Sequence, residues 1–242
     1  MNIKLPMLAA ALAAAAVSGC GKPQDDAFGR RVRAYLLEHP EVVEEAIAKL
    51  QEKKRAASGQ AAAAALASLR QQIERDPRDL VLNPNGKVTV VEFFDYRCGY
   101  CKTAAPEVLR IARENADVRF VLKEMPIFGG ISDTAAKVAL TPAGKDKGAE
   151  LYGALMGEQS LDEAALDRHL AAQGLDPAAV RKAAQAPEIA KQIADIRALA
   201  NALHIEGTPA FIVGDRMIAG ADMQALHAAI TDARAGKLQR PG

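Results

Sequence analysis

The stretch that decides the fold is VTVVEFFDYRCGYC, residues 88–101. Its first seven residues are β-branched or aromatic apart from one glutamate, and apolar positions stand side by side, which predicts a strand buried on both faces. Cys98 and Cys101 follow this strand directly. Residues 102–115 have the pattern of a helix that is interrupted or kinked at Pro106. The two cysteines are therefore expected where a buried strand passes into a helix.

A C-x-x-C pair at the start of a helix is suited to reversible disulfide exchange. Two intervening residues let the sulfurs meet within one helical turn, so a disulfide can close and open there. The free N–H groups and the dipole of the helix N-terminus stabilise the thiolate of Cys98. Cys101 lies one turn deeper and can attack a mixed disulfide to release a substrate. We expect Cys98 to be the nucleophile and Cys101 the resolving thiol.

Three other roles of the pair stay open. Structural zinc takes four ligands, but the chain has only one further cysteine and its 4 histidines are scattered. A static disulfide is the second alternative, although a short-loop disulfide at a helix start is more often labile. The third is Cu(I) binding by the thiolates of Cys98 and Cys101, which can coexist with redox exchange. No resident cofactor is expected.

The segments after the cysteine pair predict an α/β fold. Residues 118–122 form the next apolar strand, which gives a strand–helix–strand unit with a right-handed crossover. Residues 131–204 carry helical segments and no strand signal. Strands return at 210–213 and 217–219, and a closing helix is expected over about residues 222–235. The predicted layout is βαβ, a helical insertion, and ββα.

A helical arm precedes the first strand. Residues 28–75 carry apolar side chains at helical spacing, with a break at His39-Pro40 and a weaker pattern around Ser58-Gly59. An isolated amphipathic arm must bury its apolar stripe, either on its own domain or on the same arm of another subunit. Residues 20–27 are polar and are expected to form a tether.

Residues 1–19 are predicted to be an export signal. A positive charge at Lys4 precedes an alanine-rich apolar run that is too short to span a bilayer. The sequence VSGC, residues 17–20, resembles a bacterial lipobox, in which the cysteine is lipidated and becomes the mature N-terminus. An ordinary secretory signal is the alternative. With lipidation at Cys20, the expected location is the periplasm, anchored to the outer membrane, where disulfide chemistry is possible.

The composition excludes some classes of protein. The chain has 31 basic and 30 acidic residues and a formal net charge of +1. This balance gives no electrostatic footprint for a nucleic-acid partner. Three cysteines are too few for a disulfide-stapled scaffold.

Two motifs together resemble a known family. EFFDYRCGYC, residues 92–101, and GTPAF, residues 207–211, are similar to the DsbA-type branch of the thioredoxin superfamily. The resemblance covers about residues 79–236. It implies a thioredoxin fold with a helical insertion at about residues 131–204, and thiol–disulfide oxidoreductase activity.

The same resemblance implies roles for three further residues. Pro209 is expected to be cis and to face the cysteine pair, leaving the backbone of Thr208 free for strand-like pairing with a substrate peptide. Glu92 is expected to be a buried acid near Cys101 that can shuttle protons. The alternative for Glu92 is a surface glutamate on an edge strand.

The arm resembles one particular group within this family. FGRRVRAYLLEHPEVVEEA, residues 28–46, is similar to the N-terminal segment of the suppressor-of-copper-sensitivity C (ScsC) proteins. This implies a disulfide isomerase or reductase that acts on exported cysteine-containing proteins, with a membrane redox partner that reduces or reoxidises the pair. It also implies a homotrimer through residues 28–75, and a monomer is the alternative because DsbA-like lipoproteins carry related arms. A DsbA-like dithiol oxidase and a Cu(I)-binding copper-tolerance protein are the alternatives.

Three polar residues stand at the ends of predicted elements. Lys123 and Glu124 are expected either to pair near the site or to form a solvated strand end. His204 is expected to end a helix and to have no catalytic role.

Overall fold

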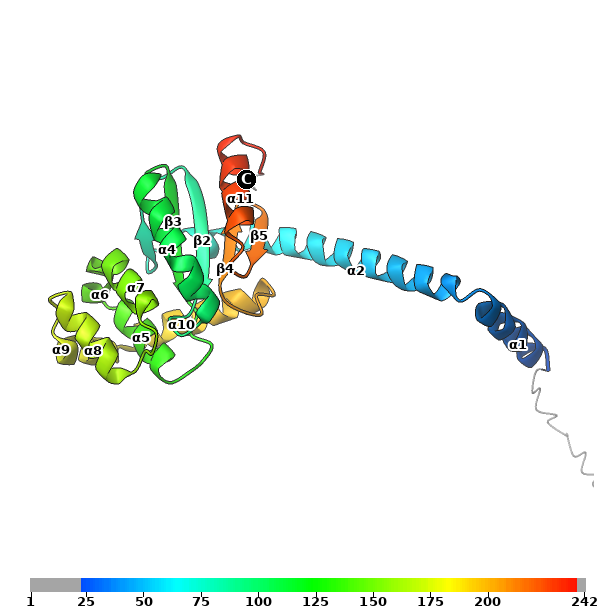
Figure 1. Cartoon of the computed structure of the whole chain (residues 1–242), viewed down its shortest axis with the longest axis horizontal. Coiled ribbons are helices and arrows are strands. Elements are labelled where there is room, and N and C mark those ends of the chain that lie inside the picture. The colour runs from blue at the N-terminus through cyan, green and yellow to red at the C-terminus, as the bar shows by residue number, and fades with distance from the viewer. Residues whose placement is uncertain (1–22, 239–242) are drawn as a thin grey trace, which may run out of the picture. The chain divides into compact units, whose positions relative to one another are not determined.

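The computed structural model describes residues 23–238 (Figure 1). Contacts divide the chain into two compact units, residues 1–56 and 57–242. Side chains are described for residues 27–53 and 64–238. Cys20 and the predicted export signal lie outside the described residues.

The described part of the first unit is helical. Helix α1 (Pro23–Glu38) is followed by α2 (Glu41–Ser68), whose first part belongs to this unit, and the predicted break at His39-Pro40 is confirmed. The expected tether is helical from Pro23 onward, because the fixed φ of proline suits the first turn of a helix. None of the helices between residues 23 and 238 is both long and apolar enough to span a lipid bilayer.

The second unit is built on a mixed five-stranded sheet of order β1-β3-β2-β4-β5. Strands β2 and β3 are parallel, and the other neighbouring strands are antiparallel. Helix α4 (Gly99–Glu114) connects β2 to β3, and α11 (Met223–Arg234) closes the chain after β5. The strands are β1 (Leu80–Leu82), β2 (Val88–Phe94), β3 (Val118–Glu124), β4 (Ala210–Val213) and β5 (Arg216–Ala219).

The region between β3 and β4 contains helices joined by loops and no strand. Its helices are α5 (Ile131–Ala139), α6 (Pro142–Asp146), α7 (Gly148–Gly157), α8 (Glu163–Ala172), α9 (Pro177–Ala183) and α10 (Pro187–Ala202). The predicted layout of βαβ, helical insertion and ββα is therefore confirmed.

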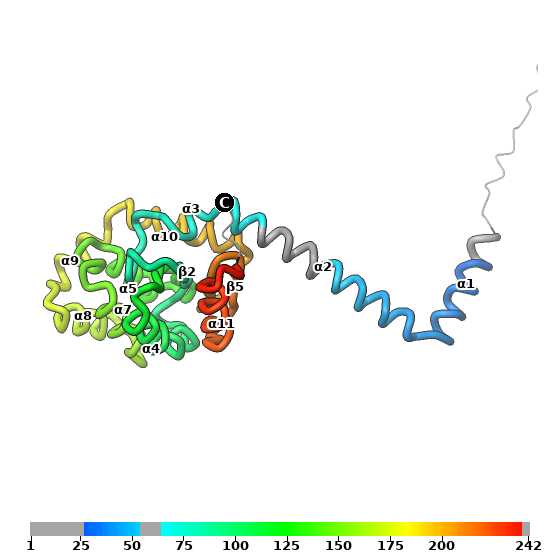
Figure 2. Tube along the Cα trace, turned by 90° about the horizontal axis from the view of Figure 1, so that it is seen from above, coloured from blue at the N-terminus to red at the C-terminus, as the bar shows by residue number. Residues whose placement is uncertain are grey.

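Helices cover both faces of the sheet. Val90 and Phe94 of β2 pack in the core that includes residues of α4, α7 and α11. Val91 and Phe93 face the opposite way, into the core that includes α3 (Arg70–Glu74) and α10. Figure 2 shows β2 between α4 on one side and α10 on the other. The prediction of a strand buried on both faces is confirmed, because successive side chains of a strand point to opposite faces.

The second half of the expected arm, 28–75, belongs to the second unit. Leu66 and Ile73 are buried in the core on the α10 face of the sheet. Two buried cations of β3 reach the backbone of α3: Lys123 Nζ donates to Gln72 O (2.6 Å) and Arg119 Nη1 donates to Glu74 O (2.9 Å). The helical spacing of apolar residues could not predict which part of the arm packs against the domain and which part stays exposed, because both parts have the same period.

Candidate active site

Cys98 caps the first turn of α4. Its backbone is extended (φ −70°, ψ 118°), and its sulfur accepts a hydrogen bond from the backbone N–H of Cys101 at 3.3 Å. Hydrogen bonding from Cys101, together with that from the Tyr100 backbone, lowers the pKa of the Cys98 thiol to about 6 against the opposing effect of burial. Both cysteines are free thiols. The Cys101 side chain, helped by the backbone N–H groups at the helix start, therefore favours the Cys98 thiolate at neutral pH.

Cys101 has the opposite environment. Its side chain is fully buried, and burial raises the pKa of its thiol. The hydrogen bond with Cys98 and the negative charge of Glu92 raise it further. Within one helical turn the site thus holds one thiol that ionises readily and one that keeps its proton.

The segment before β4 reaches the pair from 110 residues away. The Cys98 thiol donates a hydrogen bond to the Thr208 carbonyl oxygen at 3.1 Å. The peptide bond between Thr208 and Pro209 is cis, which confirms that prediction. The hydroxyl oxygen of Thr208 is buried and has no hydrogen-bond partner. The two sequence motifs therefore meet at the Cys98 sulfur.

Glu92 lies on a central strand and is fully buried, so the alternative of an edge-strand surface residue is wrong. The hydroxyl of Tyr152 donates to its Oε2 (3.0 Å) and Oε1 (3.2 Å). Burial raises the pKa of the Glu92 carboxyl to about 8, the Tyr152 hydrogen bond opposes this, and the Cys98 charge adds to it. Tyr152 comes from α7, in the insertion, and no sequence signal pointed to it.

Glu124 is a second buried acid on the same side of the sheet. The Tyr96 hydroxyl donates to its Oε1 at 2.8 Å, and its Oε2 has no partner. Burial raises the pKa of Glu124 well above its usual value. The negative charges of Asp95 and Glu92 add to the rise in the pKa of Glu124, whereas the charge of Cys98 contributes to the raised pKa of Glu92.

Lys123 does not pair with Glu124, and neither side chain is solvated, so both expectations were wrong. Adjacent residues of a strand point to opposite faces, and Lys123 Nζ pairs with Asp79 Oδ2 at 2.5 Å. Burial raises the pKa of Asp79 to about 6, and the Lys123 charge opposes this. This ion pair belongs to the face of the sheet opposite the cysteines.

Asp95 directly follows β2 and is another buried residue that the motif contained but that we did not single out. Its carboxylate accepts four hydrogen bonds, from the backbone of Arg97, Ile127 and Phe128 and from the hydroxyl of Ser132. The segment that carries the cysteines is thereby tied to the loop that follows β3.

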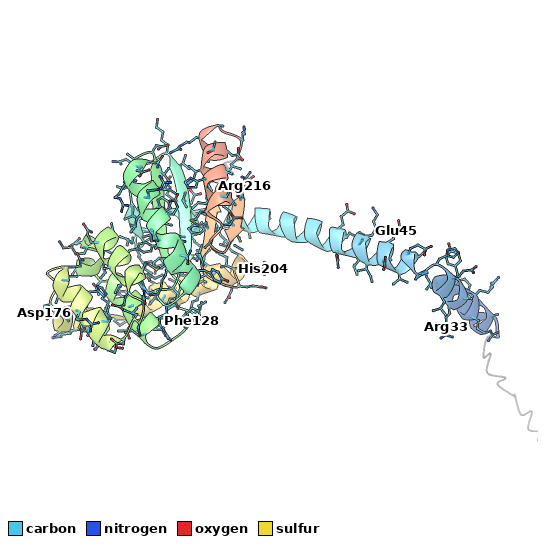
Figure 3. All side chains as sticks on the ribbon, viewed as in Figure 1. Arg33, Glu45, Phe128, Asp176, His204 and Arg216 are labelled. Carbon is cyan, nitrogen blue, oxygen red and sulfur yellow. The ribbon has the colours of Figure 1, made fainter. Side chains whose placement is uncertain are left out.

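His204 follows α10 in a left-handed conformation (φ 55°) and is exposed. It lines a hollow with Met125, Ile127 and Arg197. Figure 3 shows His204 and Phe128 along the same edge of the second unit. Its expected lack of a catalytic role stays a prediction.

Metal ligands of the usual kinds do not gather in the described part of the chain. Between residues 23 and 238, no three His, Cys, Asp or Glu side chains are placed to hold one ion. This observation does not bear on Cu(I) binding by Cys98 and Cys101, because that site would have only two protein ligands.

Comparison with known proteins is consistent with this geometry. The DSBA-like thioredoxin domain family matches residues 89–231, and the N-terminal domain family of the copper resistance protein ScsC matches residues 24–57. A thioredoxin-like oxidoreductase from Silicibacter pomeroyi is 38% identical, with a TM-score of 0.65 over 69% of this chain and 98% of that one. A linker-deletion variant of Proteus mirabilis ScsC is 25% identical, with a TM-score of 0.68 over 93% of this chain and 100% of that one.

The curated relatives are longer than the matched region. The thiol:disulfide interchange protein DsbA of Bordetella pertussis is 32% identical over 137 residues, which cover 54% of this chain and 65% of that protein. The chain spans between 26% and 65% of the length of the curated relatives that it matches. The family match, the strand order and the meeting of the two motifs agree, and the chain belongs to the DsbA-like thioredoxin family.

Proposed function

We propose that the protein is a thiol–disulfide oxidoreductase of the bacterial envelope that isomerises or reduces disulfides in exported proteins. The observation that carries the proposal is the contrast between two thiols one turn apart. Cys98, with its lowered pKa, is ionised at neutral pH, and the buried Cys101 is not. This is the arrangement that a nucleophile and a resolving thiol require.

The exchange proceeds in two steps. The Cys98 thiolate attacks a substrate disulfide, forms a mixed disulfide and releases one substrate thiolate. Cys101 then loses its proton and attacks the Cys98 sulfur, so that two electrons pass to the substrate and the Cys98–Cys101 disulfide forms. In isomerisation, a second substrate thiol displaces Cys98 instead, and the pair ends the cycle reduced.

Glu92 is the proton acceptor that we assign to Cys101. A pKa of about 8 places its carboxyl near the working pH, where proton transfer in either direction is efficient. Thr208 supplies a backbone position next to Cys98 with which an extended substrate segment can pair, and Pro209 fixes the backbone there.

The direction of electron flow follows from how strongly the Cys98 thiolate is stabilised. The nucleophile has a pKa of about 7 in thioredoxin and about 3.5 in DsbA, and the more acidic thiol belongs to the stronger oxidant. A pKa of about 6 for Cys98 lies nearer the thioredoxin value, which supports isomerase or reductase work. The reduction potential of the pair, measured in a glutathione series, tests this. A potential as oxidising as that of DsbA would favour the dithiol oxidase.

The activity is tested with single cysteine variants. Cys98→Ala is expected to abolish reshuffling of a scrambled disulfide substrate, and Cys101→Ala is expected to accumulate the mixed disulfide. Cys20→Ala is the matched control and is expected to keep the activity. Full activity of Cys98→Ala would contradict the assignment.

We also propose that the arm assembles the protein into a homotrimer. In each arm helix three apolar side chains follow at i, i+4 and i+7 and remain largely exposed: Phe28, Val32 and Tyr35 in α1, and Val43, Ile47 and Leu50 in α2. A stripe of this kind needs a partner surface. Because Leu66 and Ile73 belong to the second unit, the assembling segment is 28–56 rather than 28–75.

The assembly is tested in the full chain by light scattering. Ile47→Glu is expected to reduce the mass from trimer to monomer, because it places a charge in the stripe. Leu37→Glu is the matched control, since Leu37 is exposed but lies outside both triads. An unchanged mass in Ile47→Glu, or a monomeric native chain, would contradict the trimer.

The location that we propose is the periplasm, with a lipid anchor on Cys20 in the outer membrane and a membrane redox partner that resets the pair. The support is the leader pattern and the family. Cys20→Ala is expected to move the protein from the membrane fraction to the soluble fraction. Unchanged partitioning would remove the anchor.

Copper binding is the second candidate function, and the ScsC N-terminal match favours it. Two thiolates at C-x-x-C spacing suit Cu(I). Anaerobic titration of the reduced protein with Cu(I), compared with Cys98→Ala, tests this. Absence of binding to the reduced pair would end it.

A further inference from the structure

Lys102 is a half-buried cation beside the cysteine pair. It follows Cys101 directly in α4, and its backbone N–H donates to the carbonyl oxygen of Cys98 at 3.0 Å. Its ammonium group donates a hydrogen bond to the backbone carbonyl oxygen of Glu158. Within the described part of the chain, this ammonium forms no ion pair with a carboxylate. Its positive charge is therefore not cancelled by direct contact with an acid.

Lys123, by contrast, is fully buried and is neutralised by an acid, because its Nζ pairs with Asp79 Oδ2 at 2.5 Å. A lysine that leaves water without such a partner loses solvation that its charge requires. Burial accordingly lowers the pKa of Lys102, and the negative charges around it oppose this, those of both cysteines among them. Because an interaction between charges is mutual, the ammonium in turn favours the thiolate forms of the cysteines.

The helical insertion fixes the position of this ammonium. Helices α4 and α7 pack side by side (Figure 1), and Glu158 is the C-cap residue of α7, at the negative end of the helix dipole. The carboxylate of Glu158 is engaged elsewhere, with Nε2 of His169 (3.0 Å) and the backbone N–H of Ser160 (3.2 Å). The backbone carbonyl of Glu158 is therefore the group that receives Lys102.

The step that needs a positive charge is the attack of Cys101 on the mixed disulfide. The thiol must lose its proton in a buried place, where burial and the hydrogen bond with Cys98 raise its pKa. The negative charge of Glu92 raises that pKa further. Forming a thiolate there is costly unless a cation compensates for the lost solvation. The ammonium of Lys102, the next residue along the chain, supplies a charge of the required sign.

We infer that Lys102 is a positioning residue that acts through Cys101: its ammonium, held by the Glu158 carbonyl, stabilises the Cys101 thiolate in the resolving step. This inference rests on the proposed exchange activity and adds a residue to its second step. In that step the proton of Cys101 passes to the Glu92 carboxylate, and the bond between Cys98 and the substrate sulfur breaks. The bond between the two cysteines forms, and the substrate leaves as a thiolate. Lys102 keeps its proton throughout.

The experiment separates the two steps in single turnovers. The full-length chain is used with Cys20→Ala, so that Cys98 and Cys101 are its only thiols. The reduced protein is mixed with a large excess of oxidised glutathione, which makes the first step faster than the second, and acid-quenched samples are analysed by mass spectrometry. Loss of the dithiol reports the attack by Cys98. Conversion of the glutathione mixed disulfide to the Cys98–Cys101 disulfide reports the attack by Cys101.

Four variants of this chain are compared. Lys102→Met removes the charge and keeps the length of the side chain. Lys102→Gln also removes the charge but keeps a hydrogen-bond donor, and Lys102→Arg keeps the charge. Arg113→Met is the matched control, because Arg113 is an exposed cation of the same helix. Urea unfolding of each variant shows whether its fold is kept.

Both neutral variants are expected to slow the attack by Cys101 about two- to fivefold, the size of a charge interaction that involves a partly exposed group. The attack by Cys98 is expected to change less, because hydrogen bonds at the helix start already stabilise its thiolate. Lys102→Arg is expected to keep the native rate of the second step, and Arg113→Met is expected to keep both rates.

Two results would overturn the inference. One is an unchanged rate of attack by Cys101 in a folded neutral variant. The other is an equal slowing of both steps in all three variants of Lys102, the arginine variant included, since the lysine would then hold α4 against α7 and its charge would not matter. Failure of the native chain to form the Cys98–Cys101 disulfide with oxidised glutathione would instead refute the exchange activity.

Discussion

Replacing Glu92 by glutamine is expected to stabilise the protein relative to the native chain, by an amount that grows as the pH rises. The carboxyl titrates at about 8 in the folded protein against an ordinary value of 4.5, because it is buried. Between these two pH values the unfolded chain releases a proton that the folded protein keeps. Stability therefore falls as the pH rises through this window. Glu92→Gln has no such proton, so the variant escapes the loss.

The size of the effect follows from the interval. One pH unit is worth about 1.4 kcal/mol. From pH 5 to pH 8 the free energy of unfolding of Glu92→Gln is expected to rise by roughly 3 to 4 kcal/mol relative to the native protein. Glutamine can still accept the hydrogen bond from Tyr152. Its amide group adds a constant cost of about 1–3 kcal/mol if it finds no acceptor, which shifts the difference without changing its slope.

The assay is urea unfolding of the disulfide form at pH 5, 6, 7 and 8. Neither cysteine titrates in that form, while burial, the largest cause of the shift, remains. Glu150→Gln is the matched control, because Glu150 is exposed on the helix that carries Tyr152, and its difference from the native protein is expected to be flat. A flat difference for Glu92→Gln as well would refute the reasoning.

Three other perturbations have expected outcomes. The alkylation rate of Cys98 by iodoacetamide should be half-maximal near pH 6, and a midpoint near 8.5 would show an unactivated thiol. Lys123→Ala leaves Asp79 buried without its cation and should cost about 3–5 kcal/mol in urea unfolding; an exposed pair would cost under 1 kcal/mol. Ile73→Ala should lower the free energy of unfolding by about 2–5 kcal/mol. A negligible loss would mean that α3 is not packed in the core of the second unit.

The parts of the site that were predictable from sequence are local. The strand, the cysteine pair and the helix start lie within residues 88–101, and the period of the apolar side chains together with the C-x-x-C spacing places them. The family resemblance implied that Glu92 is buried, and its place in a strand with apolar residues on both faces agrees with this. Local patterns sufficed because each element is set by residues that are close together in the chain.

The pairing of side chains was not predictable, because it depends on register and on distant helices. Glu92 and Glu124 share one side of the sheet because Glu92 pairs with Leu122, and Phe94 with Glu124, in parallel register. The sequence alone could have shown that Lys123 and Glu124 do not pair, because adjacent residues of a strand point to opposite faces of the sheet. The partner of Glu92, however, is Tyr152, 60 residues away, in a helix whose sequence carries no mark of that contact.

The helical insertion therefore contacts residues around the cysteine pair as well as covering the thioredoxin sheet. It supplies Tyr152, which holds the Glu92 carboxyl, and Ser132, which bonds the carboxylate of Asp95. Its last helix, α10, ends at Ala202, from where the chain passes within a few residues to Thr208 at the Cys98 sulfur. The sheet and α4 create two thiols of opposite character. The insertion holds the carboxyl to which we assign the proton of Cys101, so substitutions in the insertion should change proton transfer while leaving the cysteine geometry in place.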